Sequence, residues 1–174
     1  GGTQYVAAFL FNDSRGRVLL IEKAKPEWQA GRFNGVGGKI EAGETSLTAV
    51  QREIEEETGL SPGMYRLDED RPFVTLAFPG LGLDGGCVHF YRGVGAIHLG
   101  EKREAETPWI KAVESLTFGE NPGDCLPNLA WLIPLARYQH DTYEQITVRE
   151  SSAEPVERIT DDRGDELEHG ADTD

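Results

Sequence analysis

The hydrophobic pattern of the N-terminal part predicts a pair of strands followed by a loop. Residues 4–11 (QYVAAFLF) and 17–23 (RVLLIEK) are largely apolar runs, and the residues between them are the turn-formers NDSRG. Two β-prone runs joined by a short polar turn are typical of a β-hairpin. Residues 24–38 are rich in glycine and contain Pro26, so they are expected to form a loop.

A helical pattern follows this loop. Leu47, Val50 and Ile54 recur at positions i, i+3 and i+7, which places them in one apolar stripe of a helix. Thr45 is suited to the N-cap of this helix, and Gly59 is suited to its C-terminal end. The sequence therefore predicts one helix between these two residues.

The rest of the chain predicts further strands, a second helix and an acidic tail. Residues 126–140 carry a helical apolar pattern, in which Pro134 is expected to kink the helix or to mark its effective start. Residues 151–174 hold nine acidic and two basic residues and almost no apolar ones, which is typical of disorder. We expect one domain over residues 1–150 and a disordered tail over 151–174. The further strands are expected at residues 72–78, 87–99, 107–110 and 142–150.

Charge and composition narrow the classes of partner. The chain has 31 acidic and 17 basic residues and a net charge of −14. Such a charge disfavours binding to nucleic acid polymers and to anionic membranes, and a phosphate-bearing substrate would need a cation to bind. The sequence holds no apolar run long enough to span a bilayer. Cys87 and Cys125 lack metal-type spacing, so we expect free thiols in a cytoplasmic protein, with a disulfide as the alternative.

Three glutamates of the first predicted helix pose an electrostatic question. Glu53, Glu56 and Glu57 are spaced i, i+3 and i+4, so they share one face of the helix and repel one another. The basic residue closest to them, Arg52, belongs to an adjacent face. A hard divalent cation such as Mg²⁺ takes carboxylate ligands and would offset this repulsion. The spacing alone is equally compatible with a solvated acidic face.

The residues around these glutamates resemble the Nudix box, whose pattern is G-x5-E-x7-R-E-U-x-E-E-x-G-U with U an apolar residue. A match without gaps is very rare by chance, because each residue type occupies about one position in twenty. The resemblance implies an α/β fold, the Nudix α/β/α sandwich with a mixed central sheet. The matching residues are Gly38, Glu44, Arg52, Glu53, Ile54, Glu56, Glu57, Gly59 and Leu60.

The resemblance also implies a reaction and a set of metal ligands. Nudix proteins typically hydrolyse a nucleoside diphosphate linked to another group, by attack of water at phosphorus with the help of Mg²⁺ or Mn²⁺. The expected ligands are the carboxylates of Glu53, Glu56 and Glu57 and the carbonyl of Gly37. The residues expected to orient these ligands, by hydrogen bonds and an ion pair, are Arg52 and Glu44.

The general base varies within this superfamily between a box glutamate and one from a later loop. The segment 100–110 (GEKREAETPWI) offers three glutamates. In MutT-type members a glutamate lies a few residues before the aromatic residue of a short strand, and counting back from Trp109 favours Glu104 as a metal ligand or base. The alternative for this segment is an acidic loop without chemistry. Glu53 and Glu57 are the catalytic candidates within the box.

Residues outside the box suggest how a nucleotide is held. The segment 31–39 (GRFNGVGGK) resembles the one before the box in MutT-type and oxidised-purine-triphosphate members, where an asparagine and a nearby aromatic contact the base. This resemblance assigns base contact to Asn34 and Phe33, and the similar segment 125–136 adds Asn128, whose amide can donate and accept. Lys39 and Lys23 are candidates for phosphate contact. The alternatives are a turn role for Asn34, a helix cap for Asn128 and solvated lysines.

The sequence as a whole predicts an enzyme that acts on a small-molecule nucleotide. We expect metal-dependent hydrolysis of a nucleoside triphosphate, with a purine or modified purine base, to the monophosphate and pyrophosphate. Hydrolysis of ADP-ribose, NADH or a dinucleoside polyphosphate is the alternative within the family, although the SQPWPFPxS stretch of NADH pyrophosphatases is absent. A nucleotide-sensing domain is the alternative without catalysis, and the intact box favours an enzyme.

Overall fold

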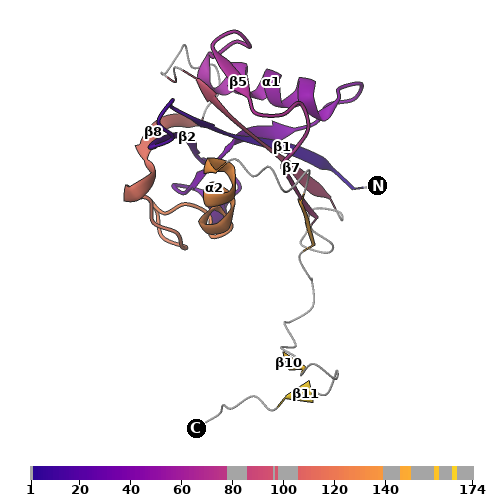
Figure 1. The fold of residues 1–174 in the computed structure, drawn as a ribbon, viewed down its shortest axis with the longest axis vertical. Helices are drawn as coiled ribbons and strands as arrows, with labels where there is room; N and C mark the ends of the chain where they lie inside the picture. The colour runs from indigo at the N-terminus through magenta and orange to yellow at the C-terminus, as the bar shows by residue number, and fades with distance from the viewer. Residues whose placement is uncertain are drawn as a thin grey trace.

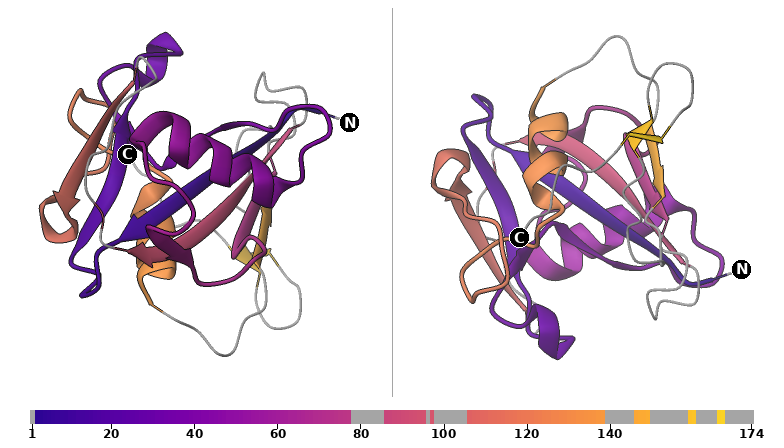
Figure 2. Two further views of the ribbon diagram at one scale, coloured as in Figure 1. Left: turned by 90° about the horizontal axis from the view of Figure 1, so that it is seen from above. Right: turned by 90° about the horizontal axis from the view of Figure 1, so that it is seen from below.

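In the part of the chain that the structure describes, a nine-stranded mixed sheet lies between two helices, α1 (Ser46–Thr58) on one face and α2 (Leu129–Arg137) on the other (Figures 1 and 2). The structure is a computed structural model that describes residues 2–77, 86–95, 97, 106–138, 146–149, 159–160 and 166–167. Two short 3-10 turns are η1 (Glu27–Gln29) and η2 (Val113–Ser115). The strands of the sheet are β1 (Gln4–Phe11), β2 (Arg17–Glu22), β3 (Phe33–Asn34), β4 (Val36–Lys39), β5 (Tyr65–Leu67), β6 (Val74–Ala77), β7 (Cys87–Gly95), β8 (Thr107–Ala112) and β9 (Ile146–Arg149).

Strand β1 lies at the centre of the sheet and is paired on both edges. It runs antiparallel to β2 and β4 on one edge, and parallel to β7 along its whole length on the other. The main path of paired strands is β3-β2-β1-β7-β6-β9, while β8 pairs with β2 and β5 pairs with β7. Parallel and antiparallel pairs together make the mixed central sheet that the sequence predicts.

Alternate residues of β1 belong to two separate hydrophobic cores. Val6 and Leu10 are buried in the core beneath α1, whereas Phe9 and Phe11 are buried in the core beneath α2. A strand covered on both faces needs apolar residues at every position, so this segment forms a continuous hydrophobic run. Burial on both faces confirms the predicted α/β/α sandwich.

Both ends of α1 lie where the sequence predicts them. The Thr45 hydroxyl accepts a hydrogen bond from the Thr48 amide at 3.1 Å, and the Thr48 hydroxyl accepts one from the Thr45 amide at 3.0 Å. An N-cap of this kind stabilises a helix by about 1 kcal/mol. Gly59 ends the helix with a φ of 79°, a left-handed conformation that glycine adopts without strain.

Helix α2 is shorter than the predicted helix over residues 126–140. It begins at Leu129, and Pro134 lies inside it, so the proline does not mark its start. The amide of Leu126 donates to the carbonyl of Phe33 at 2.9 Å, next to a β-bridge between Phe33 and Cys125. This contact with β3 holds the preceding residues outside the helix and overrides their helical pattern.

Two short strands, β3 and β4, lie within the segment predicted to be a loop. Gly37 and Gly38 give β4 no alternation of side chains, so the hydrophobic pattern does not reveal a strand there. A Cβ atom at Gly37 would collide with the carbonyl oxygen of Val6 on β1. Glycine is therefore needed for β4 to lie this close to β1.

The other predicted strands are present, with ends that differ from the prediction. Within the predicted run over residues 87–99, the structure describes β7 over Cys87–Gly95, and β8 extends to Ala112. Within the acidic tail, β10 (Ile159–Thr160) and β11 (Glu166–Leu167) pair as a two-stranded antiparallel sheet. Most of the tail lies outside the described residues, so its disorder and the division of the chain at residue 150 stay predictions.

Two expectations from composition have structural counterparts. Cys87 and Cys125 are free thiols, so the disulfide alternative does not apply. In the part of the chain that the structure describes, no helix is both long enough and apolar enough to cross a bilayer.

Candidate active site

Two glutamates of α1 point toward the sheet and are buried. Glu53 is 9% exposed and Glu57 is 4% exposed, although carboxylates are rarely buried without a partner. The Glu53 carboxylate lies directly against Gly38 of β4, where a Cβ atom would collide with it. The missing side chain at Gly38 is therefore what makes room for a buried carboxylate.

The electrostatics of this pair are unfavourable without a positive charge. The carboxyl groups of Glu53 and Glu57 are close enough for each to shift the pKa of the other. Burial, and then the charge of Glu53, raise the pKa of Glu57 to about 9, and burial also raises the pKa of Glu53. Among the described residues, Glu57 Oε2 is buried and has no hydrogen-bond partner. Such a pair is a site for positive charge, which a shared proton or a bound cation can supply.

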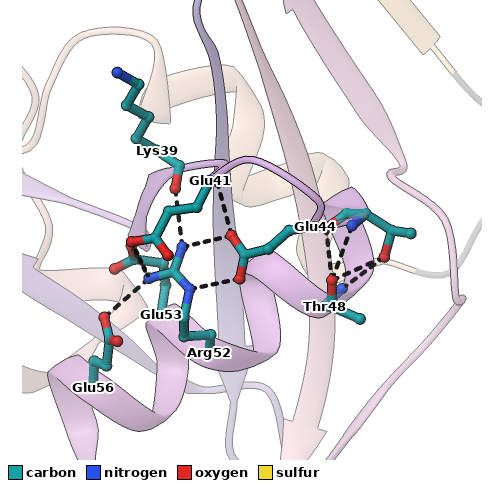
Figure 3. Close-up of polar contacts among 8 residues, drawn as sticks. Lys39, Glu41, Glu44, Thr48, Arg52, Glu53 and Glu56 are labelled. Carbon is teal, nitrogen blue, oxygen red and sulfur yellow. Dashed lines mark hydrogen bonds and ion pairs between the residues drawn. The ribbon is translucent and has the colours of Figure 1, made fainter.

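Arg52 joins the acidic residues around α1 into one network (Figure 3). Its guanidinium donates to both carboxylate oxygens of Glu44, at 2.7 and 2.9 Å, to Glu53 at 2.8 Å and to Glu56 at 3.0 Å. It also donates to the carbonyl of Lys39 at 3.0 Å. The bonds between Arg52 and Glu44, above all, raise the pKa of the arginine and lower that of the glutamate. The long side chain of Arg52 thus reaches the acidic face and orients two of its carboxylates.

The described residues fit a divalent cation held by few protein ligands together with water. Glu53 and Glu57 form a close pair, whereas Glu56 is turned toward Arg52. Nowhere among the described residues do three acidic, histidine or cysteine side chains converge on one point. Mg²⁺ commonly binds through one or two carboxylates and keeps several waters. The Oε2 atom of Glu57, which has no hydrogen-bond partner among the described residues, can serve as one of its ligand atoms. The Gly37 carbonyl, which the resemblance assigns to the metal, lies one residue from the Glu53 contact.

A cleft with a volume of about 740 Å³ opens beside these residues. This size is typical of sites for small molecules. Gly37 and Gly38 belong to its wall, so the cleft reaches the strand against which Glu53 lies. Of the described residues that line the wall, Lys23 is the one that is charged. The lining residues are Tyr5, Val6, Ala7, Lys23, Pro26, Trp28, Gln29, Asn34, Gly35, Gly37, Gly38, Val88, Phe90, Leu126, Pro127 and Asn128.

Both asparagines that the resemblance assigns to base contact line this cleft. Asn128 directly precedes α2, but its side chain makes no capping hydrogen bond, so the helix-cap alternative does not apply to it. Asn34 Oδ1 accepts a hydrogen bond from the Gly35 amide at 2.8 Å. Asn34 therefore shapes the local turn as well as the wall of the cleft.

Phe33, which the resemblance assigns to base contact, is not among the lining residues of this cleft, and its contact with a base stays a prediction. Its side chain is buried and packs edge-on against Trp109, with ring centroids 6.4 Å apart, and Lys111 Nζ lies 4.2 Å from its ring centroid. Neighbouring side chains of a strand point to opposite faces, so β3 turns Phe33 away where it presents Asn34. The aromatic part of the wall is instead Trp28, which is 64% exposed.

The two candidate lysines lie in different places. Lys23 lines the cleft, and its Nζ donates to Glu106 Oε1 at 3.0 Å. Lys39 is exposed and does not line the cleft, and its side chain points away from the box carboxylates (Figure 3). Of the two, Lys23 is the one that a ligand in the cleft would meet. Glu104 lies outside the described residues, whereas Glu106 is within them.

Comparison with known proteins agrees with this geometry. The profile described as NUDIX domain matches residues 3–120, a range that includes the entire box. The chain belongs to the NUDIX domain family. This match confirms the family membership that the box residues indicate.

Two curated relatives show how far the Nudix similarity extends. A Mycobacterium tuberculosis protein named putative 8-oxo-dGTP diphosphatase 2 is 46% identical over 125 residues, which cover 69% of this chain and 79% of that protein. A Danio rerio protein named oxidized purine nucleoside triphosphate hydrolase is 52% identical over 46 residues, which cover 26% of this chain and 29% of that protein. The chain thus spans most of the first relative and less than a third of the second. Both relatives bear the names of hydrolases.

A solved structure supports the fold. A hydrolase of the NUDIX family from Clostridium perfringens has a TM-score of 0.59 and 18% identity, over 77% of this chain and 95% of that one. At this identity the likeness concerns the fold alone, and it confirms the Nudix sandwich.

Sequence reasoning missed two residues of this Nudix site, Trp28 and Glu106. The carbonyl of Trp28 is held by the buried Arg32, which also donates to the carbonyl of Gly119. An aromatic residue in an otherwise polar, glycine-containing loop was the available signal for Trp28. Glu106 resembles its acidic neighbours in sequence, and only its contact with the distant Lys23 distinguishes it.

Proposed function

We propose that this Nudix protein hydrolyses a nucleoside triphosphate, with a purine or modified purine base, to the nucleoside monophosphate and pyrophosphate, with Mg²⁺ or Mn²⁺ as cofactor. The observation that carries the proposal is the buried Glu53–Glu57 pair, whose unpartnered oxygen belongs to a site beside a cleft of small-molecule size. The negative charge of this pair would repel an anionic substrate unless a cation binds between the carboxylates and the substrate.

The protein's part in this reaction is to hold charges in fixed positions. A bound Mg²⁺ or Mn²⁺ would supply positive charge to the phosphate oxygens and lower the pKa of the attacking water. The bonds from Arg52 keep the carboxylates in place while the substrate binds. The proposed ligands are Glu53, Glu56, Glu57 and the carbonyl of Gly37, with Arg52 and Glu44 as the residues that orient them.

Attack of water at phosphorus needs a group that accepts the proton of the water. A cation bound at the pair would keep Glu53 and Glu57 ionised, and either carboxylate could then take that proton. A bond forms between the water oxygen and phosphorus, and the bond to the leaving pyrophosphate breaks. Glu104 is the alternative acceptor, which the resemblance implies.

Recognition of the base is proposed to rest on Asn34, Asn128 and Trp28. The two amides can each donate to and accept from a base edge, and an indole ring offers an apolar face for stacking. Lys23 is the proposed phosphate contact, because it is the charged residue of the wall. The names of the two relatives, an oxidized purine nucleoside triphosphate hydrolase and a putative 8-oxo-dGTP diphosphatase, support a purine triphosphate as substrate.

A screen of phosphate and pyrophosphate release tests this proposal. With Mg²⁺, at least one purine or oxidised purine triphosphate should be hydrolysed at least about tenfold faster than ADP-ribose, NADH or a dinucleoside polyphosphate. Removal of the metal with EDTA should abolish turnover. A lead of about tenfold for one of the other compounds would replace the proposed substrate class. Binding of nucleotides without turnover of any of them would indicate a nucleotide sensor.

The proposed partner is a small nucleotide and not a nucleic acid polymer or a membrane. A net charge of −14 disfavours both polyanionic nucleic acid and anionic lipid. We also propose a cytoplasmic location, because Cys87 and Cys125 are free thiols, as is usual in reducing compartments.

A further inference from the structure

An ion pair lies at the wall of the cleft, where β2 ends and β8 begins. Lys23 Nζ donates to Glu106 Oε1 at 3.0 Å, and the amide of Ala24 donates to Glu106 Oε2 at 2.8 Å. The side chains of Lys23 and Glu106 are 20% and 14% exposed, so the pair is better shielded from water than a surface ion pair. Both oxygens of Glu106 are occupied by donors of the protein, and this arrangement fixes the Lys23 ammonium.

This ion pair and the buried acidic pair of α1 border the same cleft. Lys23 lines its wall together with Gly37 and Gly38, and the Glu53 carboxylate lies directly against Gly38. The donors of Arg52 are directed elsewhere, to Glu44, Glu53, Glu56 and a carbonyl. Lys23 is therefore the cation on the substrate side of the site.

We propose that Glu106 is a positioning residue for Lys23, and that together they set how tightly the free enzyme binds a divalent cation. This inference rests on the proposed metal-dependent function of the site. The Lys23 ammonium repels a cation at the acidic pair, and the Glu106 carboxylate offsets part of that repulsion. A substrate phosphate that takes up the ammonium removes the repulsion, so the cation is held more tightly when substrate is present.

Binding of Mn²⁺ alone, measured from the EPR signal of free Mn²⁺ and by calorimetry, tests the inference without turnover. Lys23→Met should tighten Mn²⁺ binding roughly 5- to 10-fold, because it removes a positive charge near the site. Glu106→Gln should weaken binding by a similar factor, because the amide can still accept from the Ala24 amide while the negative charge is lost. The double variant should return close to wild type, since both charges are then absent.

Matched controls remove the same charges elsewhere on the molecule. Lys25 and Glu114 are exposed and do not line the cleft, so Lys25→Met and Glu114→Gln should leave the Mn²⁺ affinity within about twofold of wild type. A double variant that binds as weakly as Glu106→Gln would identify Glu106 as a metal ligand and overturn the positioning role. Equal affinities in all variants, or no Mn²⁺ binding by wild type, would overturn it as well.

Hydrolysis assays on the same proteins separate this inference from the proposed function. Turnover by wild type together with Mn²⁺ affinities that do not change would refute the inference alone. Opposite shifts of Mn²⁺ affinity, with no turnover of any nucleotide by wild type, would refute the function alone. If Lys23 also contacts a phosphate, Lys23→Met should raise KM while it tightens Mn²⁺ binding, a combination that a purely structural role does not produce.

Discussion

Two clusters of arginines and carboxylates lie in the two helix layers, and they differ in their balance of charge. In the layer of α1, the guanidinium nitrogens of one arginine lie within 3.9 Å of carboxylate oxygens of four glutamates. A fifth glutamate of this cluster, Glu57, is buried and does not pair with the arginine. At the end of α2, two arginines face two carboxylates. The first cluster, the box cluster, consists of Arg52 with Glu41, Glu44, Glu53, Glu56 and Glu57. The second, the helix-end cluster, consists of Arg15 and Arg92 with Asp68 and Glu69.

The helix-end cluster is saturated by bonds within the protein. Arg92 is buried, and it donates to Glu69 at 2.6 Å and to the carbonyls of Leu135 and Tyr138 at 2.9 and 3.0 Å. Arg15 donates to a further carbonyl at the same end of α2. Cations at this position satisfy the last carbonyls of the helix and suit its dipole. Because its positive and negative charges are equal in number, the cluster can stabilise the fold without a bound ion.

The box cluster has more carboxylates than its arginine can serve. Arg52 uses its donors on Glu44, Glu53 and Glu56, and Glu57 Oε2 is left without a partner among the described residues. An arginine surrounded by carboxylates therefore does not by itself indicate a ligand site. A cluster with more carboxylates than arginines is suited to bind a cation, whereas a cluster with equal numbers of both is suited to stabilise the fold.

Breaking the helix-end cluster should have the largest effect, and the effect should fall on stability. Arg92→Met leaves Glu69 and two carbonyls without a donor, and losing one partner of a buried pair costs about 3–5 kcal/mol of unfolding free energy. Urea unfolding followed by circular dichroism measures this loss. Arg52→Met is the matched change in the box cluster, and it should cost less than Arg92→Met, because the side chain of Arg52 is 22% exposed whereas that of Arg92 is 6% exposed. Equal losses in the two variants would remove the distinction between the clusters.

Removing charge from the box cluster should instead affect turnover. Glu57→Gln should lower kcat at saturating Mg²⁺ by at least ~10², the scale of a positioned catalytic or metal-binding group. Its melting temperature should stay the same or rise slightly, because a buried repulsion is relieved. Glu69→Gln, the matched change in the helix-end cluster, should leave kcat per folded molecule within about threefold. Unchanged kcat in Glu57→Gln would reject its assignment as a ligand.

The start of α2 should govern specificity, whereas its end governs stability. Asn128→Ala should weaken discrimination between bases by about 1–3 kcal/mol, because a polar group of the preferred base then lacks its partner. The loss should appear in kcat/KM for the preferred base among four triphosphates, and Mn²⁺ affinity should not change. If wild type and variant rank the four bases identically and lose activity equally, Asn128 has a structural role.

The raised pKa of Glu57 should make stability depend on pH when divalent cations are removed. Its folded-state pKa of about 9 lies above the ordinary 4.5, so the contribution of this group is lost as pH rises through that window. Between pH 7 and 8 in EDTA, the unfolding free energy should fall by at most about 1.4 kcal/mol, the value for one proton. Chemical unfolding at the two pH values measures this. The slope should disappear in Glu57→Gln and shrink with Mg²⁺, and a slope that persists in the variant would belong to other groups.

The parts that the sequence predicts well depend on residues that are close along the chain. Thr45 and Gly59 bound α1 because caps are set by the few residues at each end of a helix. The face shared by Glu53, Glu56 and Glu57 follows from helical spacing in the same way. The box therefore identifies both its own helix and the family from one short segment.

The parts that could not be predicted depend on contacts between distant segments. The orientation of Phe33 follows from how β3 pairs with β2, which no local pattern specifies. Trp28 reaches the cleft through a loop whose carbonyl is held by Arg32. The pairing of Lys23 with Glu106 depends on the alignment of β2 with β8. The orientation of Phe33 and the pairing of Lys23 with Glu106 are consequences of strand register, which a single sequence leaves open.

The central position of β1 bears on how the protein is made. Its partner on one edge, β7, comes much later in the chain, with Gln4 paired to Cys87 and Phe11 to Val94. A ribosome therefore releases β1 long before β7, and in the interval one edge of an almost wholly apolar strand has no partner. Contacts this distant also slow folding. We expect the yield of native protein to depend on how quickly synthesis passes residue 95, and on chaperones that shield β1 until then.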